Sequence, residues 1–314
     1  MWYLWLPAAL LTVAALALLT SYICFRKVFY FGKKPTVKEG EYDIPPGKEY
    51  DKYRSQLEAW IDEARSLPHE HFEITSHDGL RLHAKYYECN KDGIVELLFH
   101  GYKGNSERDM SGAIERCFSL GRNAFIVDQR ACGASEGDVI TFGIKEYRDC
   151  LDWINFAISH FGKDVRLIIS GVSMGAATVV LAAGEKLPKN VVCALADCGY
   201  SSAEKIIKKV IKEMGLPERI LYPFVRLGAI VFGKFDPNER TPEEAITHAS
   251  VPIILLHGDA DGFVPCYMSE ELYELCSSKK KFVKISGADH GLAFPADKNG
   301  YLSAVADFQT ECGF

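Results

Sequence analysis

The pentapeptide GVSMG at residues 171–175 carries the residue types that nucleophilic catalysis needs. It follows an apolar run and opens a helical pattern at Met174, which predicts that Ser173 lies at a strand-to-helix turn. Side chains at the two glycines would clash in so tight a turn. The unpaired amides of a helix N-terminus favour a developing negative charge. A Gly-Ser turn that merely caps a helix is the alternative, but the context favours a nucleophilic serine.

A serine hydroxyl is a weak nucleophile and needs a base that a carboxylate orients. Asp261 follows a predicted strand at 253–256, and His290 lies in a glycine-flanked loop after a predicted strand at 281–285. Taken singly, the aspartate would be an ordinary turn former and the histidine a loop residue. Because catalytic groups collect at the carboxyl ends of strands in open α/β sheets, the three residues together predict a triad of Ser173, Asp261 and His290.

Acyl transfer also requires two amide donors for the oxyanion. We expect one to be the backbone N–H of Met174 and the other the N–H of Tyr102, in the loop at 100–105. The glycine-rich HGGG form of that loop is absent. This chemistry requires no metal and no organic cofactor. Cys193 and Cys198 are the closest pair of cysteines, and no second pair follows at the spacing of a zinc finger.

Short apolar runs alternate with helical patterns from about residue 70 onward. The Asp-Gly pair in the turn at 76–79 predicts a hairpin between strands at 71–75 and 80–88. The later runs show little polar alternation, so we expect an α/β fold with a mostly parallel sheet of about eight strands, flanked by helices. Strands are expected at 94–99, 124–127, 167–170, 191–196, 253–256 and 282–285, and helices at 106–120, 144–161, 174–186, 269–276 and 301–311.

The stretch between Asp197 and Pro252 is far longer than a usual connection. Within it, residues 206–214 present one apolar helical face, and residues 220–232 present a second, more hydrophobic one. We therefore expect a small helical lid at about 203–249, inserted into the sheet domain.

Residues 2–25 contain no charged side chain, and a helix of that length would measure roughly 36 Å, enough to cross a bilayer core of about 30 Å. A cleaved signal peptide is the alternative, with residues 15–17 as its cleavage site. The lack of Lys or Arg before the apolar run favours an uncleaved transmembrane anchor at 1–25. The aromatic residues expected at the two membrane interfaces are Trp2, Tyr3, Trp5 and Tyr22.

The charge distribution suggests an orientation and excludes one class of partner. Positive side chains follow the span, so the positive-inside rule predicts a single-pass membrane protein with a cytoplasmic catalytic domain. The scattered positions of the ten cysteines agree, because they form no small disulfide framework. A net charge of -6 without a basic patch argues against nucleic acid. The positive residues are Arg26, Lys27, Lys33 and Lys34.

Residues 26–69 are expected to contain a linker and an amphipathic helix, and residues 70–314 the catalytic domain. Apolar side chains recur at helical spacing within 48–66, and Pro68 should end that helix. The helix either packs on the domain or lies near the membrane.

Residues from about 70 to 314 resemble the α/β-hydrolase superfamily. They are most similar to the branch that contains serine-aminopeptidase-like hydrolases, monoglyceride lipases and feruloyl or cinnamoyl esterases. The resemblance rests on HGYKGN at 100–105, DQRACGASEG at 128–137, GVSMG, ADCGYSS at 196–202, HGDADGFVP at 257–265 and GADHG at 287–291.

The resemblance implies the α/β-hydrolase fold and the chain order Ser, Asp, His. It assigns the acid to Asp261 and not to Asp259. Some members place the acid after an earlier strand, which makes Asp197 the reserve candidate. Ala131 stands where the family has a glycine, which implies a slightly remodelled turn near the site.

These features predict a serine hydrolase that cleaves acyl esters through an acyl-enzyme intermediate. The anchor and the apolar lid suit a small-molecule ester, including a lipid-derived one. A serine peptidase is the first alternative, with Glu136 and Glu204 as possible groups for a peptide terminus. A catalytically silent binding protein is the second, although such proteins usually lack a triad residue and none is missing here.

Overall fold

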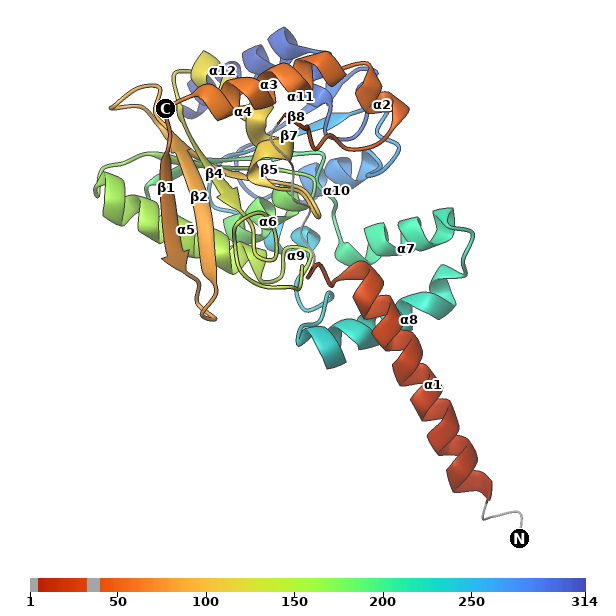
Figure 1. Cartoon of the computed structure of the whole chain (residues 1–314). Coiled ribbons are helices and arrows are strands. Elements are labelled where there is room, and N and C mark those ends of the chain that lie inside the picture. Colours follow the sequence, from red (N-terminus) through yellow and green to blue (C-terminus); the bar gives the residue numbers. More distant parts are fainter. Residues whose placement is uncertain (1–4, 33–39) are drawn as a thin grey trace.

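The central sheet has eight strands in the order β1-β2-β4-β3-β5-β6-β7-β8 (Figure 1). The computed structural model describes residues 5–32 and 40–314. β1 and β2 pair antiparallel with their neighbours, and all later pairs are parallel. The strands are β1 (Glu70–Thr75), β2 (Arg81–Tyr87), β3 (Val95–Phe99), β4 (Asn123–Asp128), β5 (Leu167–Val172), β6 (Val191–Asp197), β7 (Ile253–Gly258) and β8 (Lys280–Ile285). The predicted mostly parallel α/β sheet is confirmed.

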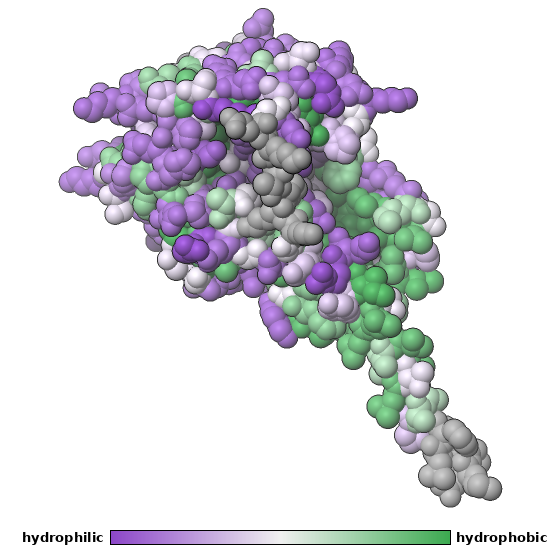
Figure 2. Space-filling model, viewed as in Figure 1, coloured by the Kyte–Doolittle hydropathy of each residue, from purple (hydrophilic) through white to green (hydrophobic). Residues whose placement is uncertain are grey.

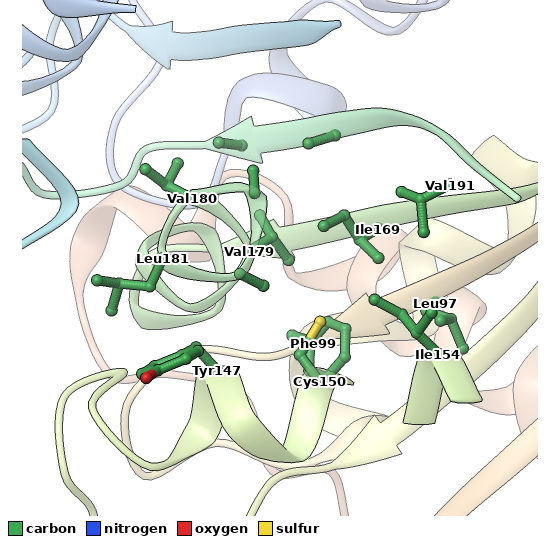
Figure 3. Close-up of a cluster of buried hydrophobic side chains, with 14 of the residues drawn as sticks. Leu97, Phe99, Tyr147, Cys150, Ile154, Ile169, Val179, Val180, Leu181 and Val191 are labelled. Atoms are coloured by element: carbon green, nitrogen blue, oxygen red, sulfur yellow. The ribbon is translucent and has the colours of Figure 1, made fainter. Parts of the chain in front are cut away.

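Helices cover both faces of this sheet. Every residue of β3, β4 and β7 is buried, which explains why these strands are apolar without alternation. Figure 3 shows one of the two interfaces, where strand residues such as Phe99 and Ile169 meet Cys150 and Val179 from two different helices. The helices that cover the sheet are α3 (Arg54–Ser66), α4 (Ser106–Ser119), α5 (Glu146–Phe161), α6 (Met174–Ala183), α10 (Tyr267–Leu275), α11 (Ala293–Ala296) and α12 (Lys298–Cys312).

The amphipathic helix expected at 48–66 is two helices, α2 (Lys48–Asp51) and α3. Tyr53 breaks the run, because its ψ of 3° departs from the helical value. The helix ends at Ser66, since Leu67 before Pro68 takes the extended conformation that a following proline imposes. Trp60 and Ile61 are buried, so α3 packs on the domain.

Four short elements occupy the long connection after β6. They are α7 (Ala203–Glu213), α8 (Glu218–Gly228), the π-helical turn η2 (Ala229–Gly233) and α9 (Pro242–Ile246). The two predicted apolar faces correspond to α7 and to α8 with η2. The sequence reasoning did not anticipate α9, which begins with a capping box between Thr241 and Glu244 and a proline in its first turn.

The N-terminal helix α1 (Trp5–Val28) is long and apolar enough to cross a membrane, and the expected boundary at residue 25 falls inside it. A membrane anchor and a signal sequence both have this character. Most of α1 projects away from the domain (Figure 1), but one side of its last turns, with Ser21, Cys24 and Phe25, is buried, and Phe29 just beyond it is fully buried. Trp2, Tyr3 and the side chain of Trp5 lie outside the described residues, so only Tyr22 of the expected aromatic residues can be placed.

Candidate active site

Ser173 occupies a sharp turn between β5 and α6. Its φ of 56° is positive, a conformation that non-glycine residues rarely adopt. A Cβ on Gly171 would lie 2.2 Å from the backbone of Gly175, and one on Gly175 would lie 1.9 Å from the carbonyl oxygen of Phe99. Both positions therefore require glycine, as the tight turn predicted. This strained turn places Ser173 just beyond the end of β5, at the amino end of α6.

Ser173, His290 and Asp261 lie in one hydrogen-bonded chain. The Nε2 atom of His290 is 2.9 Å from the Oγ atom of Ser173, and its Nδ1 atom is 2.7 Å from Oδ2 of Asp261. Because Nδ1 faces a carboxylate, it carries the ring proton, which leaves Nε2 free to accept the serine proton. The structure thus brings together all three residues that the sequence predicted.

Asp261 is held in its ionised form. Burial favours the neutral acid, but hydrogen bonds from His257 and His290 outweigh it and lower the pKa of Asp261 to about 2. Its second oxygen, Oδ1, accepts hydrogen bonds from the amides of Phe263 and Val264 at 2.9 and 2.7 Å. The carboxylate is therefore fixed in place and negatively charged at neutral pH.

His257 is a contact of the site that the sequence reasoning left without a role. Its Nε2 atom lies 3.2 Å from Oδ2 of Asp261 and 2.9 Å from the carbonyl oxygen of Val264. Facing two acceptors, Nε2 carries the proton, and Nδ1 accepts a hydrogen bond from Oγ of Ser269 at 2.7 Å. The sequence did contain an indication of this contact, because His257 is the first residue of the motif at 257–265 that contains Asp261.

The predicted oxyanion donors lie on the two loops that meet at Ser173. Met174 is the first residue of α6, so its amide points out of the helix end. Tyr102 follows Gly101, whose amide donates to Oδ2 of Asp109 at 3.0 Å, and precedes Lys103, whose φ is 53°. No hydrogen bond to a protein acceptor occupies the amide of Tyr102 or Met174 in the described part of the chain.

The two other aspartates considered for the acid lie elsewhere. Oδ1 of Asp259 accepts from the amide of Gly287 at 2.7 Å. Asp197 is buried, and its Oδ2 accepts from the hydroxyl of Tyr301 at 3.0 Å, while its Oδ1 has no partner among the described residues. Burial raises the pKa of Asp197. Neither carboxylate hydrogen-bonds to His290.

A cavity of about 550 Å³ opens over Ser173. No described residue of the stretch 203–249 lines it, so the expected lid does not form its wall. The segment before α3 takes that place: Ile44, Pro45 and Tyr50 line the cavity, and the hydroxyl of Tyr50 donates to the carbonyl oxygen of His290 at 3.0 Å. The sequence predicted a linker up to residue 47 and the start of an amphipathic helix at 48, but not that either would line the cavity. The cavity's other residues include Leu57, Tyr102, Val172, Phe263, Leu292, Glu49, Arg108 and Asp109.

The remaining site predictions concern the turn at Ala131 and two glutamates. Ala131 has a φ of 64°, so the alanine adopts the left-handed conformation that a glycine would favour. Glu136 binds Arg81 at the sheet edge, and Glu204 hydrogen-bonds to Asn238. Neither glutamate lines the cavity.

Among the described residues, two groups of side chains have their potential metal-ligand atoms within 4.8 Å of one another. One consists of Cys198, Asp261 and His290, and coincides with the triad. Burial raises the pKa of the Cys198 thiol, which disfavours the thiolate that a metal would bind. The other group consists of His77, Asp149 and Asp152, and Asp149 forms an ion pair with Arg130.

The sheet order, the turn at Ser173 and the position of the cavity define an α/β hydrolase. The sequence pattern of the prolyl oligopeptidase family matches residues 141–313, more than half of the chain. The chain therefore belongs to the prolyl oligopeptidase family and is a hydrolase of the serine type.

Two curated relatives and one solved structure illustrate the range of similar proteins. Uncharacterized protein YqkD of Bacillus subtilis is 25% identical over 190 residues, which are 60% of this chain and 62% of YqkD. Uncharacterized protein YfhR of Escherichia coli K12 is 25% identical over 252 residues, 76% of this chain and 80% of YfhR. The Pyrococcus furiosus esterase Pf2001 shares the fold with a TM-score of 0.66 and 22% identity, covering 89% of this chain and 99% of its own.

Proposed function

We propose that this hydrolase cleaves carboxylic esters of small molecules, with Ser173 as nucleophile, His290 as general base and Asp261 as the orienting acid. The observation that carries the proposal is the continuous hydrogen-bonded chain from Oγ of Ser173 through His290 to Asp261, at the floor of a cavity. The cavity's volume is typical of sites for small molecules.

The proposed mechanism has two half-reactions. Oγ of Ser173 attacks the ester carbonyl while its proton moves to Nε2 of His290, which then donates it to the departing alkoxide. A water molecule next attacks the acyl-enzyme and gives a proton to Nε2 of His290. His290 then returns this proton to Oγ of Ser173 as the bond to the acyl group breaks and the carboxylic acid is released. The amides of Tyr102 and Met174 hold the oxyanion in both steps, and losing one such donor typically costs on the order of a hundredfold or more in kcat.

The cavity lining favours an acyl ester over a peptide. Ile44, Pro45, Leu57, Val172 and Leu292 offer an apolar surface to an acyl chain. A serine peptidase is the alternative that the family name raises, and Glu49 is one of the cavity carboxylates that would bind a peptide's amino terminus.

We further propose that α1 anchors the protein in a membrane as a single span. Arg26 and Lys27 in its last turn favour a catalytic domain on the cytoplasmic side under the positive-inside rule. Residues 26–69 then connect the anchor to a catalytic domain at 70–314, whose insertion at about 203–249 lies beside α1.

The test uses the full chain in detergent, because residues just before position 26 pack on the domain. Hydrolysis of p-nitrophenyl esters of increasing acyl length is measured beside a Ser173→Ala control and beside aminoacyl p-nitroanilides. Activity on the esters that vanishes in the control supports the proposal. Cleavage of the anilides alone would assign the site to a peptidase. If neither is cleaved and a fluorophosphonate leaves Ser173 unlabelled, the chain does not use this serine as a nucleophile.

A further inference from the structure

The helix α8 is strongly amphipathic, with Glu218, Arg219 and Arg226 among its eleven residues, a character typical of helices that lie in a membrane interface. One side, with Tyr222, Val225 and Ala229 of the adjoining η2, is buried. The opposite side carries exposed residues at helical spacing, namely Ile220 (65% exposed), Leu227 (36%) and Ile230 (42%). The exposed side therefore lacks a protein partner among the described residues.

A third side of α8 packs directly on the N-terminal helix. A Cβ on Gly228 would lie 2.3 Å from the carbonyl oxygen of Ser21, so the two helices cross at close range through small residues. Ser21 is fully buried at this crossing. Tyr22 and Phe25 of α1 also contact Phe232 of η2, with ring centroids 5.1 and 6.0 Å apart. The position of α8 along α1 is thus fixed by packing.

That position coincides with the depth of a membrane interface. The 24 residues of α1 measure about 36 Å, so its last turns extend beyond a hydrocarbon core of about 30 Å. Ser21 lies about 8 Å along the helix from Arg26, the first charge after the span. Amphipathic helices in the interface insert their apolar face by about 5–10 Å. Figure 1 shows α8 running across α1 rather than along it.

The surface around the crossing is continuous. Figure 2 shows hydrophobic surface on the α1 stalk that extends onto the adjoining helical region. Leu19 and Ile23 of α1 are exposed, and so are Met214 and Leu216 between α7 and α8. The side chain of Arg219, which forms an ion pair with Glu218, is 93% exposed beside Ile220, as expected where phosphate headgroups begin.

We propose that the exposed face of α8 and η2, formed by Ile220, Leu227 and Ile230, lies in the lipid interface of the leaflet from which α1 emerges. The bilayer is the partner of this surface. Tyr102 lines the substrate cavity and donates a hydrogen bond to Val28 at the end of α1, so the cavity is held close to the same lipid surface. This inference rests on α1 being a membrane span. Combined with the proposed ester hydrolysis, it favours amphiphilic esters that reach the cavity from the membrane.

Hydroxyl-radical footprinting of the unmodified full chain tests the proposal without reference to activity. In nanodiscs that hold one chain each, we expect oxidation of Ile220 and Leu227 to be at least fivefold slower than that of Leu275. Leu275 is a matched control, because it is 44% exposed and lies on α10, outside the helices that contact α1. Equal oxidation of Leu227 and Leu275 would overturn the proposal.

Labelling by a phosphatidylcholine with a photoreactive acyl chain identifies the occupant. The proposal expects adducts on peptides spanning 218–233 and none on the peptide with Leu275. Protection of Ile220 that appears only in discs with two chains, without lipid adducts, would assign the face to a second copy and overturn the lipid assignment. Both readouts are independent of ester hydrolysis, so either proposal can fail alone.

Discussion

The hydroxyl of Tyr102 donates a hydrogen bond of 2.6 Å to the carbonyl oxygen of Val28, the last residue of α1. Tyr102 is also the residue whose backbone amide is the proposed oxyanion donor. The end of the N-terminal helix is therefore connected through one side chain to the loop that we propose stabilises the transition state.

We expect Tyr102→Phe to lower kcat several-fold with little change in the labelling of Ser173 by a fluorophosphonate. The backbone amide remains, but its loop loses a hydrogen bond that contributes about 1 kcal/mol. Tyr222→Phe is the matched control, because the hydroxyl of Tyr222 donates to Oδ1 of Asn238 at 2.5 Å and both residues belong to the insertion after β6. If both variants lose stability equally and neither loses kcat, the hydrogen bond to Val28 is only structural.

Asp261→Asn should reduce kcat by about 10⁴, since the neutral amide no longer holds His290 in the required tautomer. Asp197→Asn should keep most of the activity, because Asp197 bonds to Tyr301 and not to His290. Steady-state kinetics of the two variants on one ester measures the difference. A larger loss in the Asp197 variant would return the acid role to the reserve candidate.

The same carboxylates predict how stability depends on pH. The folded pKa of Asp261 is lowered from 3.8 to about 2, so its stabilising contribution is present above pH 3.8 and is lost as the pH falls toward 2. The folded pKa of Asp197 is raised, so its contribution is present below 3.8 and is lost as the pH rises through the folded value. Asp197→Asn should therefore flatten the decline of Tm above pH 3.8, which thermal melts across pH would detect.

Gly175→Ala should prevent folding or lower Tm strongly. Its new Cβ would lie 1.9 Å from a backbone oxygen of β3, which cannot move aside as a flexible side chain could. Overpacking of this kind costs roughly 1–3 kcal/mol or more. Gly262→Ala is the control, because a Cβ there meets its nearest atom at 3.9 Å and should leave Tm unchanged. Equal melting temperatures for the two variants would contradict the geometry of the turn.

Gly228→Leu should separate α8 from α1, because the added side chain would collide with the backbone of Ser21. We expect faster proteolysis within 203–233 and a lower Tm in detergent, with Leu227→Met, an exposed neighbour, as the control. Unchanged proteolysis would mean that the crossing of the two helices does not hold the insertion in place.

The double variant Ile220→Glu/Leu227→Glu should lose several-fold in activity on a long-chain ester embedded in vesicles, since the charges oppose insertion of α8. Its kcat on a soluble short ester should stay at the parent value. Leu275→Glu, equally charged at a distant exposed leucine, should change neither rate. A parallel loss on both substrates would point to damage of the site and not to membrane contact.

The sheet and the chain order of the site residues could be predicted because they depend on local patterns. Buried strands are continuous apolar runs, and the turn at Ser173 needs glycine on both sides because of backbone contacts within a few residues. The loops that follow β7 and β8 necessarily open at the same sheet edge as Ser173, so Asp261 and His290 could be placed before their distances were known.

The cover of the cavity could not be predicted in the same way. The contacts of Tyr50 with His290 join residues 240 positions apart, and nothing in the polar, proline-containing segment before α3 indicates that partner. The apolar helices at 203–233 suggested a lid by composition, but their exposed and buried faces are set by α1 and by the domain. Hydropathy alone does not distinguish a face that meets substrate from one that meets another helix.

Phe29, at the junction after α1, is fully buried and packs edge-on against Phe142 and Phe235, with ring centroids 5.6 and 5.2 Å apart. Phe142 and Phe235 follow Phe29 in the chain by more than a hundred positions, so during synthesis both rings are made much later than Phe29. The packing around Phe29 can therefore be completed only after the insertion that follows β6 has been translated. With α1 as the proposed membrane span, closure of the catalytic core would follow membrane integration in biogenesis, and a chain without Phe29 would lack a piece of its own interior.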